Sequence, residues 1–357
     1  MDFLNFTYPF GYVYFNEALV WQPVAFAYSF LISGADLLFL AAIAYFTKKM
    51  TEWIPVFLLL GLSFFSIILL GPLADLSLPY RAWRIMFHQH LFSSAQYPGM
   101  SVMALYGGVL WIITFLLGVA VTGLYMSNKS LKYSFLYADE NRYKSFESKI
   151  KILFIVLVPF TLMWSIYPGI LFISQTWLFG WRNWGMLPAM LFSETFVTAT
   201  ASAIIVGEIF KKKNKNLLLY IHSAAAIVLC ALIFIQILTW TLTVRGTMYS
   251  GIYSIYPLLI IAFLIFASTA TLSIIATKKE NLVLWVGIVA LIGVIINKWN
   301  MIINAQLISR TGMGTVKAGL HGWWFFETLS PIAIAIIVFL ILSSIYPLRG
   351  ESYETNK

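Results

Sequence analysis

Cysteine and charged residues are scarce in this 357-residue chain. The single cysteine, Cys230, excludes an internal disulfide and any iron–sulfur cluster held by cysteines of this chain alone. Charged residues make up 10% of the sequence and hydrophobic residues 61%, whereas soluble domains carry roughly 25% charged residues. This composition excludes an ordinary soluble enzyme and predicts a surface that faces lipid.

Several motifs of nucleotide-binding, hydrolytic and exported proteins are also absent. The sequence contains no Walker-type phosphate loop, no glycine-rich turn after a strand, and no evident nucleophile–base motif. Its first residues, MDFLNFTYPFGYVYF, include an acid at Asp2 and no basic segment, so they do not resemble a cleavable signal peptide. The net charge of +9 resides mainly in short loops between apolar stretches. That is a membrane pattern, and it gives no reason to expect a nucleic-acid partner.

Nine apolar stretches are long enough to cross a bilayer, which takes roughly 20 residues of helix. They lie near residues 23–46, 55–73, 100–125, 152–174, 187–209, 217–243, 254–276, 282–304 and 326–346. We therefore predict an all-α polytopic membrane protein with about nine transmembrane helices. Residues 1–350 form a single integral membrane domain in this prediction, followed by a tail at 351–357.

The basic residues predict the orientation of the chain. Sixteen of the 23 lysines and arginines fall in connections on one side of the membrane, including the run KKKNK at 211–215, and six fall on the other side. The positive-inside rule makes the basic side cytoplasmic. With nine helices, the N-terminus is then outside, and the C-terminus with its tail is in the cytoplasm.

The loops on the predicted outer side are long and aromatic. They cover residues 74–100, 175–186, 245–256 and 305–326, whereas the inner loops are short, basic and mostly poor in aromatic residues. An ordinary aromatic belt at the membrane interface explains most of the tryptophans and tyrosines. It explains less well why the outer loops are long and aromatic while the inner loops are short and basic. Long apolar-aromatic loops on one side indicate a docking surface or a site there.

Three ionisable side chains lie deep within predicted helices. Asp36 is mid-span in the first helix, Glu194 is about two turns from the outer end of the fifth, and Lys298 is in the outer half of the eighth. A charge at this depth costs at least ~2.5–3.5 kcal/mol on insertion scales. Thr198 and Ser202 continue the face of Glu194 inward at helical spacing. Two interpretations stay open: a partial proton relay, or polar pairing between helices.

The four histidines, His88, His90, His222 and His321, restrict the cofactors. His222 is alone near the inner side, where snorkelling to the interface is expected, so two haems stacked across the membrane are excluded. A single outer haem held by His321 with His88 or His90 stays open, but we expect no metal site in this chain. A secondary transporter is the other alternative, although we see no internal repeat of the kind that transporters often carry.

Two segments resemble the NrfD/PsrC-like membrane subunits of polysulfide-reductase-type respiratory complexes. The first, ADLSLPYRAWRIMF at 74–87 followed by SSAQYPGM, is similar to the family pattern D-L-G-R-P-x-R-F-W with its later S-P-M-S. The second, at 167–201, has the tyrosine-led helix end, the tryptophan loop and the L-P-x-L-F pattern of the family. A weaker similarity is NKWNMIINAQ at 297–306, where Lys298 replaces a more usual arginine. The residues that carry the two main matches are Asp75, Leu76, Pro79, Arg81, Trp83, Tyr167, Gly169, Trp184, Leu187, Pro188 and Phe192.

The resemblance implies a membrane anchor with an N-terminal four-helix bundle in 1–174, a C-terminal bundle in 187–346 and, here, one extra helix. It implies a bound menaquinone or other quinone near the outer face, and no haem. Electrons would pass between the quinone pool and an iron–sulfur subunit docked on the outer face. That partner would exchange them with a molybdopterin catalytic subunit that reduces polysulfide or a related sulfur compound, in a prokaryotic cell membrane.

The resemblance also implies site residues, which lie on the predicted outer side. Tyr167 would hydrogen-bond a quinone carbonyl. Asp75 and Arg81 would form a charged rim that exchanges quinol protons, or a structural salt bridge that closes the loop. His88 would accept a proton, because histidine titrates in the useful range. Further pocket candidates lie at the outer start of the first helix: Trp21, Gln22 and Tyr28.

Overall fold

A computed structural model describes residues 7–8, 11–12, 29–70, 102, 104–127, 137–174, 185–243, 250–308, 324–346 and 348. Apart from a short antiparallel pair, β1 (Thr7–Tyr8) and β2 (Gly11–Tyr12), the elements of this part of the chain are helices. The predicted all-α class is confirmed. Seven helices are long and apolar enough to cross a membrane, and α2 and α3 are shorter apolar helices within the described ranges. The chain is a multi-pass membrane protein.

Each of the nine predicted stretches corresponds to a helix in the described residues. The first group is α1 (Ser29–Leu31), α2 (Ser33–Thr47), η2 (Thr51–Trp53), α3 (Ile54–Ile67), η5 (Ala104–Leu110), α7 (Trp111–Met126) and α8 (Glu140–Ile173). The second group is α10 (Leu187–Ile209), α11 (Asn216–Leu242), η7 (Ser250–Ser254), α13 (Tyr256–Ala276), η8 (Glu280–Leu282), α14 (Val283–Lys298), η9 (Trp299–Asn304) and α15 (Trp324–Ile345). Two of these segments, η5 and η9, are π-helical, a rare geometry that is frequent at functional sites.

The helix that contains the fourth predicted span begins well before its apolar stretch. Residues before 152 were expected to be a loop, but α8 begins at Glu140 and runs for 34 residues. Asp139 caps the helix, because its side chain accepts a hydrogen bond from the Arg142 N–H at 2.8 Å. A helix of this length measures about 51 Å, well beyond the roughly 30 Å hydrocarbon core. Its charged first turns therefore extend the helix past the membrane.

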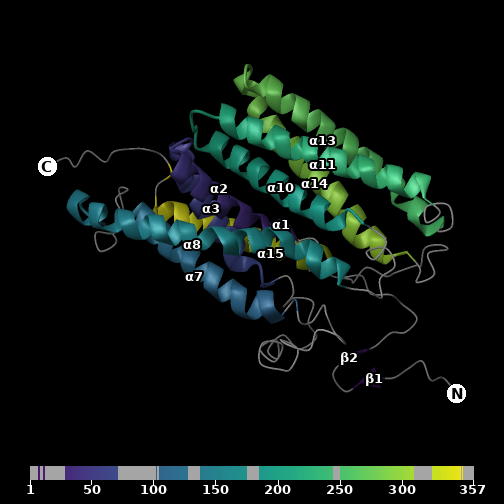
Figure 1. Cartoon of the computed structure of the whole chain (residues 1–357), viewed down its shortest axis with the longest axis horizontal. Coiled ribbons are helices and arrows are strands. Elements are labelled where there is room, and N and C mark those ends of the chain that lie inside the picture. The colour runs from purple at the N-terminus through teal and green to yellow at the C-terminus, as the bar shows by residue number, and fades with distance from the viewer. Residues whose placement is uncertain are drawn as a thin grey trace.

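The helices run side by side (Figure 1), and their contacts divide eight of the described helices into two groups of four. In the first group, α2 and α7 each pack on both α3 and α8. In the second group, α10 and α13 each pack on both α11 and α14. Helix α10 joins the groups, because it also packs on α2 and α8, while α15 lies against α3. The bundle ranges 1–174 and 187–346 stay predictions, since both include residues outside the described part.

Small residues set the closest helix contacts. A Cβ added at Gly34 of α2 would lie 2.7 Å from the carbonyl oxygen of Gly61 in α3 and 2.8 Å from the Phe65 nitrogen. Such a distance is below any real Cβ contact, so the two backbones meet directly. Lipid is as apolar as a leucine side chain, so membrane helices associate through this kind of close packing rather than through a hydrophobic driving force.

Three chain connections meet at one end of the molecule. The Trp53 Nε1–H donates to the Lys213 carbonyl at 2.9 Å, and the Asn214 amide donates to Glu52 at 3.2 Å. The Lys212 ammonium donates to the Leu348 carbonyl at 2.6 Å. The α2–α3 turn, the α10–α11 loop and the residue Leu348 beyond α15 therefore lie together. Which side of the membrane this end faces stays a prediction.

Candidate functional site

The structure describes four of the ten candidate site residues. Tyr167, Asp36, Glu194 and Lys298 lie in helices α8, α2, α10 and α14. The other candidates lie outside the described residues: Asp75, Arg81, His88, Trp21, Gln22 and Tyr28. The structure therefore describes the side-chain contacts of two clusters. One is aromatic and surrounds Tyr167, and the other is charged and surrounds Glu194.

Tyr167 lies within a cluster of aromatic rings. Its side chain is buried, and its ring stacks on that of Tyr106 with centroids 4.4 Å apart and planes 28° apart. Trp164, one turn earlier in α8, meets Tyr167 at 5.2 Å and Tyr106 edge-on at 5.4 Å. The Trp164 indole N–H donates to the Thr114 hydroxyl at 3.2 Å, which fixes the orientation of its ring. Tyr106 belongs to the π-helix η5.

The residues that follow Tyr167 explain its position. Pro168 lies inside α8 and has no N–H to donate, so the helix loses one internal hydrogen bond at this point. A Cβ on Gly169 would lie 2.5 Å from Pro188 Cα in the first turn of α10. Glycine thus lets α8 approach the start of α10, and the two halves of the second family motif are in contact.

A fully buried ion pair joins α10 and α14. The Lys298 ammonium lies 3.1 Å from Glu194 Oε2, and the exposed fractions of the two side chains are 1% and 0%. The Asn297 amide donates to Glu194 Oε1 at 3.0 Å, so both carboxylate oxygens have a partner. Pairing and hydrogen bonding of this kind are what offset the large desolvation cost of buried charges.

Asp36 brings a second buried carboxyl group to the same region. Its Oδ1 accepts a hydrogen bond from the Ser165 hydroxyl of α8, while its Oδ2 has no hydrogen-bond partner among the described residues. Helix α2, which carries Asp36, packs on both α8 and α10. We call Asp36, Ser165, Glu194, Asn297 and Lys298 the buried charge cluster. It unites four helices, α2, α8, α10 and α14, at the junction of the two groups.

His222 does not snorkel, so that expectation was wrong. The ring is fully buried, and its Nδ1 lies 2.7 Å from the Thr200 hydroxyl of α10. Its Nε2 has no hydrogen-bond partner within the described residues. The polar face that begins at Glu194 is also buried at Thr198 and Ser202. Tertiary packing of α11 on α10 covers the ring, which is 22 residues from Thr200 in sequence.

Sequence reasoning missed Tyr106 and Ser165 as members of these clusters, and Thr200 as the partner of His222. Tyr106 stacks on Tyr167 of another helix. The Ser165 hydroxyl meets Asp36 across 129 residues, and the Thr200 hydroxyl meets His222 across 22. No local pattern identifies such contacts. Among the described residues, no group of three or more histidine, cysteine, aspartate or glutamate side chains could hold a metal ion.

No family profile matches this chain. The chain is, however, 45% identical over 358 aligned positions to the C subunit of the tetrathionate reductase of Archaeoglobus fulgidus. The alignment covers 97% of this chain and 98% of that protein. This chain belongs to the NrfD/PsrC-like family of membrane subunits. The resemblance carried by the two sequence motifs is thereby confirmed. In this NrfD/PsrC-like protein, the second motif is the region where Tyr167, Gly169 and Pro188 pack between α8 and α10.

Proposed function

We propose that this chain is the quinone-interacting membrane subunit of a complex that reduces tetrathionate or a related sulfur compound. The observation that carries the proposal is the likeness to a tetrathionate reductase subunit over nearly the whole length of both proteins. The chain oxidises quinol from the membrane, and the two electrons leave through an iron–sulfur subunit to a molybdopterin catalytic subunit. With one cysteine, the chain depends on that partner for any cysteine-held cluster.

The quinone headgroup binds next to the aromatic cluster in this proposal. The Tyr167 hydroxyl donates a hydrogen bond to a quinone carbonyl, and the rings of Tyr106 and Trp164 hold the Tyr167 ring in place. Stacking at 4.4 Å and the Trp164–Thr114 hydrogen bond at 3.2 Å support this role, because they leave the phenol little freedom to turn. A donor fixed in advance loses less entropy when the substrate binds.

The remaining quinone-site residues stay proposals from the family resemblance. Asp75 and Arg81 form a charged rim beside the headgroup, and His88 accepts a proton released on quinol oxidation. Trp21, Gln22 and Tyr28, which fall outside both motifs, line the entrance at the outer start of the first helix.

The iron–sulfur subunit docks at the end of the molecule near Tyr167, which we place on the outer side of the membrane. Two features support this arrangement. The basic connections at Lys211–Lys213 and the α2–α3 turn meet at one end through the Trp53 and Asn214 hydrogen bonds. Tyr167 lies near the opposite end of α8 from the charged, extended start at Glu140. Basic residues are retained on the cytoplasmic side.

We further propose that the buried charge cluster relays protons. It contains two carboxyl groups and one ammonium, so full ionisation leaves one net negative charge in a fully buried site. Such a charge is costly within a bilayer, and one added proton makes the cluster neutral. Asp36 Oδ2, which lacks a partner among the described residues, is the atom at which we place that proton. Loss and uptake of this proton is the relay step.

The quinone role is tested by Tyr167→Phe in the purified complex. Removing one hydrogen bond to a neutral group costs about 0.5–1.5 kcal/mol, so we expect quinol oxidation to slow by a few-fold to tenfold while assembly is unchanged. The measurement is steady-state quinol oxidation with an artificial electron acceptor. Unaltered quinol kinetics in this variant would remove Tyr167 from the site.

Tyr45→Phe is the matched control for that experiment. Tyr45 is also a stacked tyrosine of the same helix group, with its ring 4.8 Å from that of Phe154. Phe154 lies 13 residues before Tyr167 in α8, which is about 20 Å along the helix axis. The control removes the same hydroxyl group at the other end of the group, and we expect it to leave quinol kinetics unchanged.

A further inference from the structure

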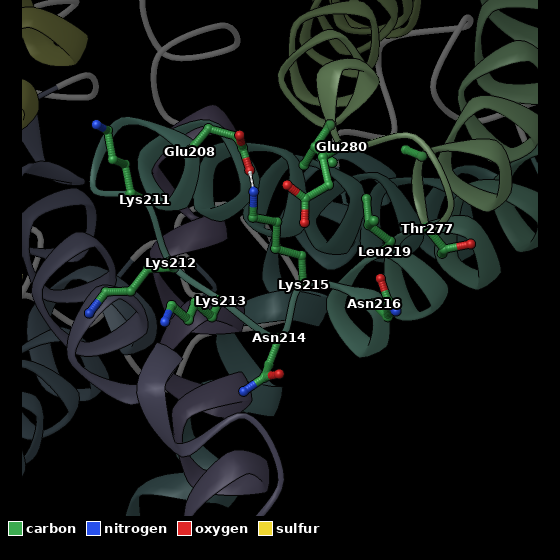
Figure 2. Close-up of a pocket in the computed structure, with 12 residues that line it drawn as sticks. Glu208, Lys211, Lys212, Lys213, Asn214, Lys215, Asn216, Leu219, Thr277 and Glu280 are labelled. Atoms are coloured by element: carbon green, nitrogen blue, oxygen red, sulfur yellow. Dashed lines mark ion pairs between the residues drawn. The ribbon is translucent and has the colours of Figure 1, made fainter.

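A cavity of about 650 Å³ opens at the end of the molecule where the basic connections meet (Figure 2). Its wall is formed by the α10–α11 loop, the first turn of α11, the end of α13 and the residues around η8. Lysines 211, 212, 213 and 215 contribute the positive charge, and Glu208 and Glu280 the negative charge. Leu219, Ala276 and Val283 make part of the wall apolar.

The cavity carries an excess of two positive charges, because four lysines and two glutamates line it. Lys215 is paired with Glu208, and the exposed fractions of these side chains are 16% and 20%. Figure 2 draws this ion pair as a dashed line, with Glu280 among the side chains that line the cavity. The Lys212 ammonium donates to the Leu348 carbonyl at 2.6 Å. Lys211 and Lys213 are exposed, and no hydrogen bond or ion pair of their side chains occurs among the described residues that line the cavity.

The loop that carries these lysines is held in a fixed shape. Lys211 and Asn214 both have φ of 54°, in the left-handed region that lysine rarely adopts. Lys211 ends α10 in this conformation: its N–H donates to the Glu208 carbonyl at 3.1 Å and the Lys212 N–H donates to the Gly207 carbonyl at 2.8 Å, which is a common helix end. Trp53 donates to the Lys213 carbonyl at 2.9 Å and the Asn214 amide donates to Glu52 at 3.2 Å, so the α2–α3 turn also holds the loop in place.

We propose that this cavity binds a phosphate group, supplied either by the headgroup of an anionic lipid or by free phosphate. The charge excess matches a phosphate, and the volume is within the range of small-molecule sites. The helix ends at Ile209, Asn216 and Ala276 place the cavity at the membrane surface. Basic pockets between membrane helices suit lipid headgroups, and the apolar part of the wall suits the first carbons of an acyl chain.

The test measures lipid binding to the purified full-length protein by native mass spectrometry. The protein is titrated with phosphatidylglycerol or with phosphatidylcholine, which carries a phosphate but no net charge. A second arm follows thermal stability in sodium phosphate and in sodium chloride of equal ionic strength. Both arms compare the wild type with Lys211→Gln/Lys213→Gln and with the matched control Lys278→Gln/Lys279→Gln, whose two exposed lysines lie near the cavity without lining it.

The outcomes separate the two sources of phosphate. For a lipid site, phosphatidylglycerol binds the wild type and the control variant, and the Lys211/Lys213 variant binds it roughly 30-fold more weakly, as expected for two lost surface lysines. For a free-phosphate site, sodium phosphate alone stabilises the wild type and the control but not that variant. Equal binding by all three proteins, or an equal loss in both double variants, overturns the proposal. If the double variant does not accumulate, Lys211→Gln alone should weaken binding about fivefold.

Discussion

The Glu194→Gln substitution tests the buried charge cluster most directly. Glutamine keeps the shape of the side chain and its acceptor for the Asn297 amide, which lies 3.0 Å from Glu194 Oε1. It removes the negative charge that lies 3.1 Å from the Lys298 ammonium, in a place where that side chain is 1% exposed. The substitution therefore leaves an ammonium group buried without its ionic partner.

The expected loss of stability follows from that geometry. Removing one partner of a buried ion pair typically costs 3–5 kcal/mol. We expect a value in this range, because the Lys298 side chain is 1% exposed and has no access to solvent once Glu194 is neutral. The double variant Glu194→Gln/Lys298→Met removes both charges and should recover much of the loss. Unfolding of the purified protein in detergent, compared across the double-mutant cycle, measures both effects.

Glu208→Gln is the matched control on the same helix. Glu208 also pairs with a lysine, Lys215, but its side chain is 20% exposed. Pairs that reach solvent contribute about 0–1 kcal/mol, so we expect a small change. If Glu194→Gln destabilises the protein no more than Glu208→Gln does, the buried Glu194–Lys298 pair does not stabilise the packing of α10 on α14 as we infer.

The same variant tests the relay. Incorporated into liposomes with its partner subunits, the Glu194→Gln complex should bind quinone normally but lose turnover or charge translocation. Without the Glu194 charge, ionised Asp36 balances the Lys298 ammonium, so Asp36 no longer takes up and releases the relayed proton. If the cluster only joins helices, both activities survive alongside the lowered stability. Full activity together with full charge translocation would refute the relay.

Two further predictions concern orientation and helix packing. On a background without Cys230, cysteines introduced in 211–216 should react only from the cytoplasmic side and those in 175–186 only from outside; reaction of both from one side would refute the topology. Gly34→Ala should lower the unfolding temperature, since its Cβ would lie 2.7 Å from a backbone carbonyl, and overpacking costs about 1–3 kcal/mol. Gly123→Ala, with no atom within 4 Å of the added Cβ, should not.

The sequence by itself determined the class of protein and the positions of its helices. Runs of roughly 20 apolar residues must be helical in a bilayer, because lipid offers no partner for an unpaired backbone N–H or carbonyl group. Within the described residues, each of the nine stretches located by that rule contains a helix, and the rule missed the part of a helix that is polar. The start of α8 at Glu140 is such a case, because a charged segment with good helix formers reads as a loop in a hydropathy pattern.

Sequence also determined the family, through short motifs around Tyr167 and Asp75. It could name Glu194, Lys298 and Asp36 as costly charges, because the cost of burying an ionisable group follows from its depth in the bilayer. It could not show that they meet. Glu194 and Lys298 are 104 residues apart, and no local spacing predicts contact over that distance.

Only the tertiary structure decided which polar groups are neighbours. Packing of α11 on α10 covers His222, packing of α2 on α8 brings Ser165 to Asp36, and packing of α10 on α14 places Lys298 beside Glu194. Stacking of Tyr106 on Tyr167 likewise depends on how η5 meets α8. These contacts follow from the angle and depth at which helices pack, which are set by small residues and close backbone approach rather than by the order of residues along one helix.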